Sequence, residues 1–216
     1  MSTPPRPRVL LADDHLMVAE ALKSLLAPDF DLVGVVEDGR ALVEAAGRLR
    51  PDVIVADVTM PHLNGIDALA QLRQSGDRVP VVFLTMHRDV SFARRALDAG
   101  ASGFVLKHSA PAELISAIRA ALEGKTYLTP QLATEVLESM KQGPEQGGDA
   151  LGSITPRQRE VLQLLAEGHA AKVIASKLSI SARTVEFHKY QMMETLGLHS
   201  NSELIHFAIK HGLVEL

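Results

Sequence analysis

The chain has 216 residues, a length that suits one large domain or two small ones. Its hydrophobic content of 46% is ordinary for a globular protein, and its formal net charge of −4 is too small to indicate a kind of partner. The absence of cysteine excludes disulfides and thiolate metal sites and agrees with a cytoplasmic location. We expect neither a signal peptide nor a membrane span, because no apolar stretch is long enough for either.

Apolar runs alternate with segments of helical periodicity up to about residue 124. The runs lie at residues 9–12, 32–36, 53–56, 81–84 and 104–106. The helical segments that follow them lie at residues 16–26, 40–49, 66–72, 90–99 and 111–122. Five repeats of strand and helix predict a doubly wound α/β fold, in which helices cover both faces of a parallel five-stranded sheet.

Charged and polar residues stand at the ends of four of these runs: Asp13-Asp14, Asp57, Thr85 and Lys107. The carboxyl ends of parallel strands meet at one edge of the sheet, which is where such folds bind ligands. Three neighbouring carboxylates repel one another unless they bind protons or a cation, and Mg²⁺ suits an all-oxygen site. A carboxylate can also form an aspartyl phosphate, whose charge Lys107 would pair with and whose oxygens Thr85 would hydrogen-bond. These residues predict Mg²⁺-assisted phosphorylation of an aspartate.

This pattern resembles the receiver domain of bacterial response regulators, which has a flavodoxin-like fold. The residues that carry the resemblance are Asp13-Asp14, Asp57-x-x-Met60-Pro61-x-x-x-Gly65, Thr85 and Lys107. The resemblance implies that Asp57 is the phosphoacceptor, supported by Thr85 and Lys107. It implies that Mg²⁺ is held by Asp14, Asp57 and the backbone carbonyl of Thr59, with Asp13 acting mainly through water. It also implies that Phe104 is a switch residue that turns inward when Thr85 moves, whereas His15 is expected to be a loop residue without a catalytic role.

The second half of the chain is predicted to be entirely helical. A helix capped by Thr129-Pro130 runs to about residue 140, and the polar, Gly-rich residues 142–149 predict a flexible linker. Thr155-Pro156-x-Gln158 predicts a capping box at the start of the next helix. Helices follow at residues 171–178, 182–196 and 202–210. We place the receiver domain at residues 8–125, the linker region at 126–152 and the last domain at 153–216.

A short turn at residues 179–181 joins two of these helices into a helix-turn-helix, whose second helix can enter a major groove. Residues 178–185 (Leu-Ser-Ile-Ser-Ala-Arg-Thr-Val), with residues 155–162 before them, resemble LuxR-type DNA-binding domains. The two halves together are similar to the NarL/FixJ subfamily of response regulators. The DNA contacts expected on this basis are Lys172, Lys177, Arg183, Thr184, Glu186 and Lys189.

The expected DNA-binding domain is only weakly basic, with seven cations against six anions in residues 151–216. Glu186 stands where the family usually has Lys or Arg, and Thr195 where it often has Lys. Glu186 would either accept a hydrogen bond from cytosine or weaken binding to non-specific DNA. On the helix at residues 182–196 we expect Val185, Met192 and Leu196 to be buried, and Lys189 and Arg183 to face outward.

We interpret the chain as a phosphorylation-controlled transcription regulator, not an enzyme, with a sensor histidine kinase and promoter DNA as partners. Phosphorylation of Asp57 would favour dimerisation on DNA, with the last helix, through Leu204, Ile205 and Ala208, as the expected dimer contact. One alternative is a phosphohydrolase, although such enzymes often have an Asp where this chain has Thr59. A second alternative is a regulator of the same fold that never takes up phosphate.

Overall fold

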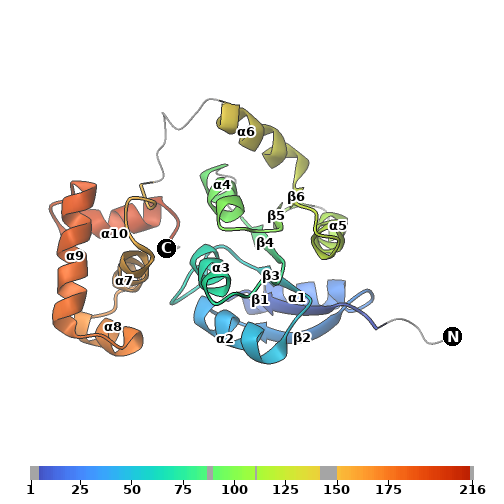
Figure 1. Ribbon diagram of the computed structural model, residues 1–216, viewed down its shortest axis with the longest axis horizontal. Coiled ribbons are helices and arrows are strands. Elements are labelled where there is room, and N and C mark those ends of the chain that lie inside the picture. Colours follow the sequence, from blue (N-terminus) through green and yellow to red (C-terminus); the bar gives the residue numbers. More distant parts are fainter. Residues whose placement is uncertain (1–4, 87–89, 110, 142–149, 215–216) are drawn as a thin grey trace. The chain divides into compact units, whose positions relative to one another are not determined.

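The structure is a computed structural model that describes residues 5–86, 90–109, 111–141 and 150–214. The chain divides into two compact units, one with all the strands and the first six helices, the other with the last four helices (Figure 1). No helix in the described parts of the chain has the length and apolar character needed to cross a membrane.

The first unit is built on a parallel sheet with the strand order β2-β1-β3-β4-β5-β6. Its strands are β1 (Arg8–Ala12), β2 (Asp31–Val36), β3 (Val53–Ala56), β4 (Val81–Thr85), β5 (Gly103–Leu106) and β6 (Tyr127–Leu128). The predicted doubly wound parallel sheet is confirmed, but it has six strands where five were expected. The added strand, β6, is two residues long and lies in the segment assigned to the linker region. So short a strand has no periodicity that a sequence could reveal.

Helices cover both faces of this sheet. They are α1 (Leu16–Leu26), α2 (Gly39–Leu49), α3 (Gly65–Gln74), α4 (Val90–Asp98), α5 (Pro111–Leu122) and α6 (Pro130–Lys141). Val9 and Leu11 of β1 join apolar residues of α1 and α5 in one core cluster. Leu10, which alternates with them, faces the opposite side, where its side chain lies close to Leu49 of α2 and to Gly34. All of these strand residues are buried, as expected for a strand between two helical layers.

The helix expected after Thr129 is confirmed as α6, which packs along α4. Thr129 is itself buried, and its hydroxyl oxygen accepts a hydrogen bond from the backbone N–H of Leu106, at 3.3 Å. Leu132 and Val136 form the buried side of α6. The predicted flexible linker at residues 142–149 lies outside the described residues.

The second unit consists of α7 (Pro156–Ala166), α8 (Ala171–Leu178), α9 (Ala182–Leu196) and α10 (Asn201–Lys210). The capping box at the start of α7 is confirmed: the Thr155 N–H donates to Gln158 Oε1 at 2.8 Å, and the Gln158 N–H donates to Thr155 Oγ1 at 3.2 Å. Leu204 and Ala208 of α10 are buried in the core of this unit. The expectation that these two residues form a dimer contact was therefore wrong, because their apolar character serves the domain's own core.

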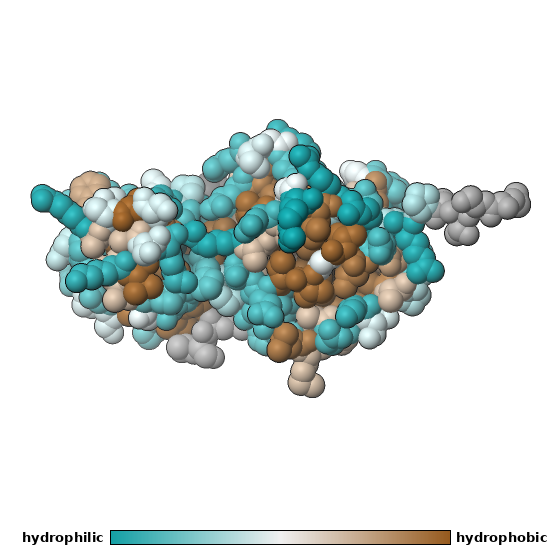
Figure 2. All heavy atoms as spheres, turned by 90° about the horizontal axis from the view of Figure 1, so that it is seen from below, coloured by the Kyte–Doolittle hydropathy of each residue, from teal (hydrophilic) through white to brown (hydrophobic). Residues whose placement is uncertain are grey.

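Apolar residues also reach the surface between hydrophilic ones, as the face drawn in Figure 2 shows. The large apolar side chains with the greatest exposure are Leu16, Met17, Val35, Met86, Leu137, Val173, Phe187 and Tyr190. Isolated surface residues of this kind need no special explanation, but neighbours on one helix can form a contact surface. Two such pairs exist among them, Leu16 with Met17 on α1 and Phe187 with Tyr190 on α9.

Candidate functional site

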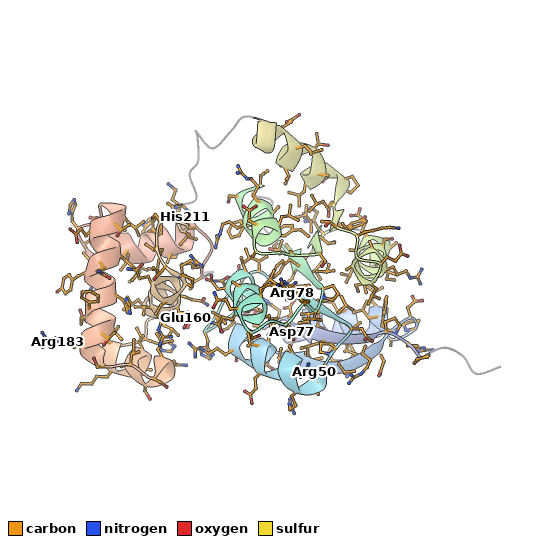
Figure 3. All side chains as sticks on the ribbon, viewed as in Figure 1. Arg50, Asp77, Arg78, Glu160, Arg183 and His211 are labelled. Carbon is orange, nitrogen blue, oxygen red and sulfur yellow. The ribbon has the colours of Figure 1, made fainter. Side chains whose placement is uncertain are left out.

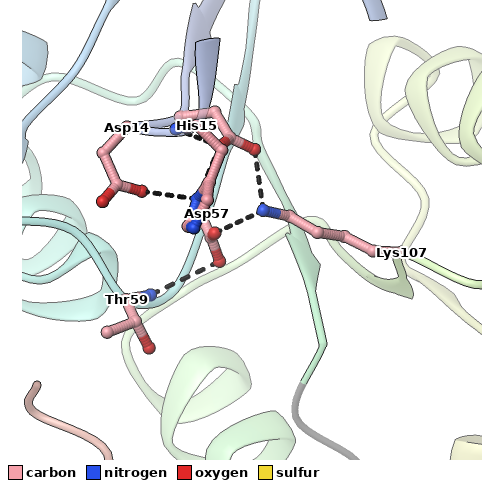
Figure 4. A network of polar contacts seen from close by, with 6 residues as sticks. Asp14, His15, Asp57, Thr59 and Lys107 are labelled. Atoms are coloured by element: carbon pink, nitrogen blue, oxygen red, sulfur yellow. Dashed lines mark hydrogen bonds and ion pairs between the residues drawn. The ribbon is translucent and has the colours of Figure 1, made fainter. Parts of the chain in front are cut away.

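The ends of three strands bring two aspartates and a lysine together. Asp13 follows β1, Asp57 follows β3 and Lys107 follows β5. The Lys107 ammonium lies 2.8 Å from Asp13 Oδ2 and 2.5 Å from Asp57 Oδ2 (Figure 4). β1 and β3 are neighbours in the sheet, and the long lysine side chain spans the distance from β5. Both aspartates are buried, and 9% of the Lys107 side chain is exposed.

Burial and charge act against each other in this pocket. Burial raises the pKa of Asp57 to about 6, although the Lys107 ammonium beside it lowers that pKa and the neighbouring Asp13 charge raises it further. Burial also acts to lower the pKa of Lys107, but the Asp57 and Asp13 carboxylates outweigh it, so that the lysine pKa is raised. Lys107 is therefore a permanent cation, and Asp57 is largely an anion at neutral pH.

The acidic side chains around Asp57 and Lys107 are suited to binding a divalent cation. One oxygen from each of Asp13, Asp14 and Asp57, and one His15 nitrogen, all lie within 4.8 Å of one another. Asp14 Oδ1 is shielded from solvent and accepts no hydrogen bond from any residue that the structure describes. A buried carboxylate oxygen without a hydrogen bond is costly and has a free lone pair for a cation. The donors therefore suit Mg²⁺, which prefers carboxylate oxygens.

The loop after β3 holds the Asp57 side chain in place. The Thr59 backbone N–H donates a long hydrogen bond of 3.4 Å to Asp57 Oδ1, and the Gly65 N–H donates to the Val58 carbonyl at 2.8 Å. A side chain at Gly65 would collide with the Asp57 carbonyl oxygen and approach the Phe83 ring to 2.8 Å. Glycine is needed here because the backbone of α3 approaches the backbone of Asp57 too closely for any Cβ atom.

Thr85 and Phe104 lie on the strands next to this pocket. Thr85 ends β4, is fully buried, and its carbonyl accepts a hydrogen bond from the Lys107 backbone N–H at 2.8 Å. Phe104 of β5 pairs in register with Phe83 of β4, and their ring centroids lie 6.3 Å apart. Phe104 is thus a core residue, and its role as a switch remains a prediction.

His15 was assigned no role from the sequence, yet its ring lies against the acid pair. Its Nδ1 is 2.9 Å from Asp14 Oδ1 and 3.3 Å from Asp13 Oδ1 (Figure 4). The signal that could have found it is its position directly after the acid pair, at the same edge of the sheet.

The second candidate site is the helix-turn-helix formed by α8 and α9. Ser179 ends α8 in a left-handed conformation with φ of 54°, which turns the chain sharply. Ser181 then caps α9: its Oγ accepts the Thr184 N–H at 3.0 Å and lies 2.8 Å from the Thr184 hydroxyl. Thr184, predicted to contact DNA, therefore already helps to form the helix cap. Val185 and Met192 are buried, as expected, and Leu196 is partly buried against the same core.

The basic side chains of this unit differ in how far they are exposed for contact with DNA. Arg183 is exposed and projects outward from α9 (Figure 3), and Lys172 on α8 is exposed as well. Lys189, by contrast, does not face outward as expected. Its ammonium lies 2.5 Å from Glu186 Oε2 and its side chain is only 12% exposed. Since Glu186 neutralises Lys189, the exposed part of α9 carries less positive charge than its sequence indicates.

Two other arginines of this unit are used for its internal structure. Arg157 donates to Glu160 Oε2 at 2.8 Å and to the Leu178 carbonyl, which ties α7 to the end of α8. Arg159 donates to the Ile154 carbonyl at 3.0 Å. The surface of α9 instead exposes two aromatic side chains, Phe187 and Tyr190, by 56% and 64%.

Comparisons with known proteins match both units of the chain. The family model "Response regulator receiver domain" matches residues 9–119, and "Bacterial regulatory proteins, luxR family" matches residues 152–208. Response regulator GacA of Pseudomonas aeruginosa is 31% identical to this chain, covering 96% of it and 98% of that protein. Transcriptional activator protein ExaE of Pseudomonas putida is 34% identical, with coverages of 96% and 98%.

Solved structures give the same result. RcsB response regulator from Salmonella typhimurium matches with a TM-score of 0.66 at 26% identity, covering 98% of this chain and all (100%) of that one. A LuxR-family response regulator from Aurantimonas matches with a TM-score of 0.60 at 36% identity, covering 63% of this chain and 99% of that one. The receiver and luxR-family matches lie in the first and the second unit of the fold, respectively. The chain therefore belongs to the two-component response regulators with a receiver domain and a luxR-family regulatory domain.

Proposed function

We propose that a sensor histidine kinase phosphorylates Asp57 and that this modification controls sequence-specific DNA binding by α8 and α9. The observation that carries the proposal is the contact of Lys107 with Asp57 and Asp13, beside an Asp14 oxygen that accepts no hydrogen bond from any described residue. A lysine held between two carboxylates is well placed to pair with a third anionic group on Asp57. The proposed domains are residues 8–125, 126–152 and 153–216, in agreement with the family matches at 9–119 and 152–208.

In the proposed reaction, a carboxylate oxygen of Asp57 attacks the phosphorus of a phosphohistidine on the kinase. The phosphorus–oxygen bond forms as the phosphorus–nitrogen bond breaks, and the imidazole leaves with its electron pair and takes up a proton. Because the carboxylate must be ionised to attack, Lys107 assists by favouring the anion within a buried site. Lys107 and Thr85 would then bind the oxygens of the aspartyl phosphate.

Mg²⁺ is the proposed cofactor, held by Asp14, Asp57 and the Thr59 carbonyl, with Asp13 acting through water. When bound, it neutralises charge on the transferring phosphoryl group. The support for this proposal is the set of oxygen donors within 4.8 Å of one another, one of which is shielded from solvent and accepts no hydrogen bond from a described residue. The described residues also include no thiol that would favour a softer metal, since the chain has no cysteine.

The proposed kinase contact is at the start of α1, next to the acid pair. Leu16 and Met17 are both highly exposed there, Met17 by 89%. Two exposed apolar residues next to the phosphoacceptor pocket give a partner a surface that positions its phosphohistidine.

Promoter DNA is the proposed partner of the second unit, in the cytoplasm, with two copies of the chain reading two half-sites. The supporting observation from relatives is that RcsB of Salmonella enterica serovar Typhimurium was solved bound to promoter P1flhDC in the presence of phosphomimetic BeF3⁻. That structure is 26% identical to this chain and matches it with a TM-score of 0.63. For the present chain, the exposed Arg183 and Lys172 are the cations most available for phosphate contacts.

Mass spectrometry of the full chain with acetyl phosphate and Mg²⁺ tests the proposal. One phosphoryl group should be gained by the native chain and none by the Asp57→Ala variant. Beryllofluoride should then tighten binding to a DNA site selected from a random pool. A chain that stays unmodified, or one that hydrolyses phosphomonoesters in sustained turnover, would contradict the proposal.

A further inference from the structure

His15 occupies the N-cap position of α1, but its side chain does not cap the helix. Its backbone N–H donates to Asp13 Oδ1 at 2.9 Å, which fixes the turn between β1 and α1. The imidazole ring points back toward the acid pair instead, with its Nδ1 facing Asp14 and Asp13 (Figure 4). The ring is half-exposed, so that its position can be reached by a hydrated ion.

The contact between His15 and Asp14 has the distance of an ion pair but not the geometry of a hydrogen bond. Nδ1 lies 2.9 Å from Asp14 Oδ1, yet that oxygen accepts no hydrogen bond from any part of the chain that the structure describes. When Nδ1 carries no proton, its lone pair and those of the two carboxylates can face the same cation. Ligands at right angles on an ion with bonds of about 2.1 Å are about 3.0 Å apart. The separations of 2.9 and 3.3 Å from Nδ1 to the two carboxylates fit that arrangement.

We propose that His15 Nδ1 is a ligand in the metal pocket, and that the pocket consequently binds first-row transition ions such as Co²⁺ and Mn²⁺ in preference to Mg²⁺. Mg²⁺ takes oxygen ligands, whereas an imidazole nitrogen favours transition metals, and affinity for a given nitrogen and oxygen site rises from Mn²⁺ to Co²⁺. The ring takes part as the neutral tautomer with its proton on Nε2. This inference rests on the metal pocket of the proposed function, which it deepens by naming the ion that the pocket prefers.

The test compares the native full-length chain with two variants. His15→Asn removes the imidazole and keeps the helix start intact, since Asn is a favoured N-cap residue. His108→Asn is the matched control, because His108 follows Lys107 at the same edge of the sheet and its side chain is exposed. Titration with Co²⁺, followed by visible absorption, and competition with Mg²⁺ give the two affinities for each protein. Pulsed electron paramagnetic resonance of bound Mn²⁺ detects a coordinated nitrogen directly.

In the native chain and in His108→Asn, we expect Co²⁺ to bind at least about tenfold more tightly than Mg²⁺ and Mn²⁺ to show a coupled ¹⁴N nucleus. His15→Asn should lose the nitrogen signal and weaken Co²⁺ binding at least about tenfold, with Mg²⁺ binding changed by no more than about twofold. Co²⁺ affinity that is equal in His15→Asn and the native chain, or the absence of the nitrogen signal in the native chain, would overturn the inference.

The two proposals fail in different ways. If Mg²⁺ binds and Asp57 takes up phosphate while the nitrogen signal is missing, the role of His15 is wrong and the proposed function stands. If neither Mg²⁺ nor Co²⁺ binds to the native chain, the pocket holds no ion and both proposals are wrong.

Discussion

The ammonium of Lys107 lies 2.5 Å from Oδ2 of Asp57, and the same ammonium lies 2.8 Å from Oδ2 of Asp13. One cation thus neutralises part of the charge of two buried carboxylates that belong to different strands. Any metal ion that enters the pocket faces the same carboxylates and the repulsion of this ammonium. Lys107 therefore stabilises the metal-free pocket and opposes the binding of a metal ion.

Replacing Lys107 by Met should tighten Mg²⁺ binding by about tenfold, because it removes a competing cation and keeps most of the side-chain volume. Isothermal titration calorimetry on the purified full-length protein measures this change. Lys125→Met is the matched control, since Lys125 pairs with Glu123 in an exposed position away from the pocket. Weaker Mg²⁺ binding in Lys107→Met would show that Lys107 supports the metal site rather than opposing it.

Asp57→Asn should stabilise the metal-free protein at neutral pH. Burial raises the pKa of Asp57 from 3.8 to about 6, so the folded state binds more protons than the unfolded state between these two values. The native protein therefore loses stability as the pH rises from about 4 to about 6, and the loss stays constant above that range. Asn has no such loss, so the variant's advantage should grow to about 3 kcal/mol at pH 7. Urea unfolding in the presence of a chelator, at pH 4.5 and pH 7, measures it.

An equal difference between the two proteins at both pH values would contradict the raised pKa of Asp57. Added Mg²⁺ provides an internal check. It should stabilise the native protein more than Asp57→Asn, because only the native protein has the full set of carboxylates.

Gly65→Ala should destabilise the protein by about 2–3 kcal/mol, since the new methyl group collides with the Asp57 carbonyl and the Phe83 ring. The shift of this loop should also weaken Mg²⁺ binding, because Asp57 and Thr59 both belong to it. Gly47→Ala is the control, as a Cβ atom at Gly47 in α2 meets no atom within 4 Å. That control should be stabilised by about 0.5–1 kcal/mol, as expected for alanine in place of glycine inside a helix. Thermal and urea unfolding of both variants give the comparison.

The sequence predicted most of the first unit because a buried parallel strand produces a distinctive apolar run. Val53–Ala56 could hardly be another element, and its end placed Asp57 at the edge of the sheet. The strand β6 was missed because two residues cannot show a pattern and because its pairing with β5 depends on long-range geometry. The sequence identified Gly65 only as a position in a motif. It could not show that the backbone at Gly65 packs against the backbone of Asp57, because that contact forms only in the folded chain.

Side-chain contacts were harder to predict than backbone elements. The apolar spacing of Leu204 and Ala208 correctly indicated a helix with one apolar face, but spacing does not distinguish a core from a dimer contact. Lys189 was expected to face outward because lysine usually does, yet Glu186 three residues before it holds it against the helix. The position of His15 directly after the acid pair places it near the carboxylates, but the direction in which its ring turns depends on the folded loop.

Glu186→Gln should strengthen binding to non-specific DNA and make it more sensitive to salt. In the native chain Glu186 holds the Lys189 ammonium at 2.5 Å, so this cation is not available to a phosphate. Removing the carboxylate charge frees Lys189, and one further phosphate contact should increase the salt slope of binding by about 0.9. Fluorescence anisotropy with a labelled random duplex, at several salt concentrations, measures the slope.

Glu194→Gln is the control. It changes an exposed position on the same helix, makes the same change in net charge and should leave the slope almost unaltered. Equal slopes in the two variants would mean that net charge, and not the Glu186–Lys189 pair, determines how this helix approaches DNA.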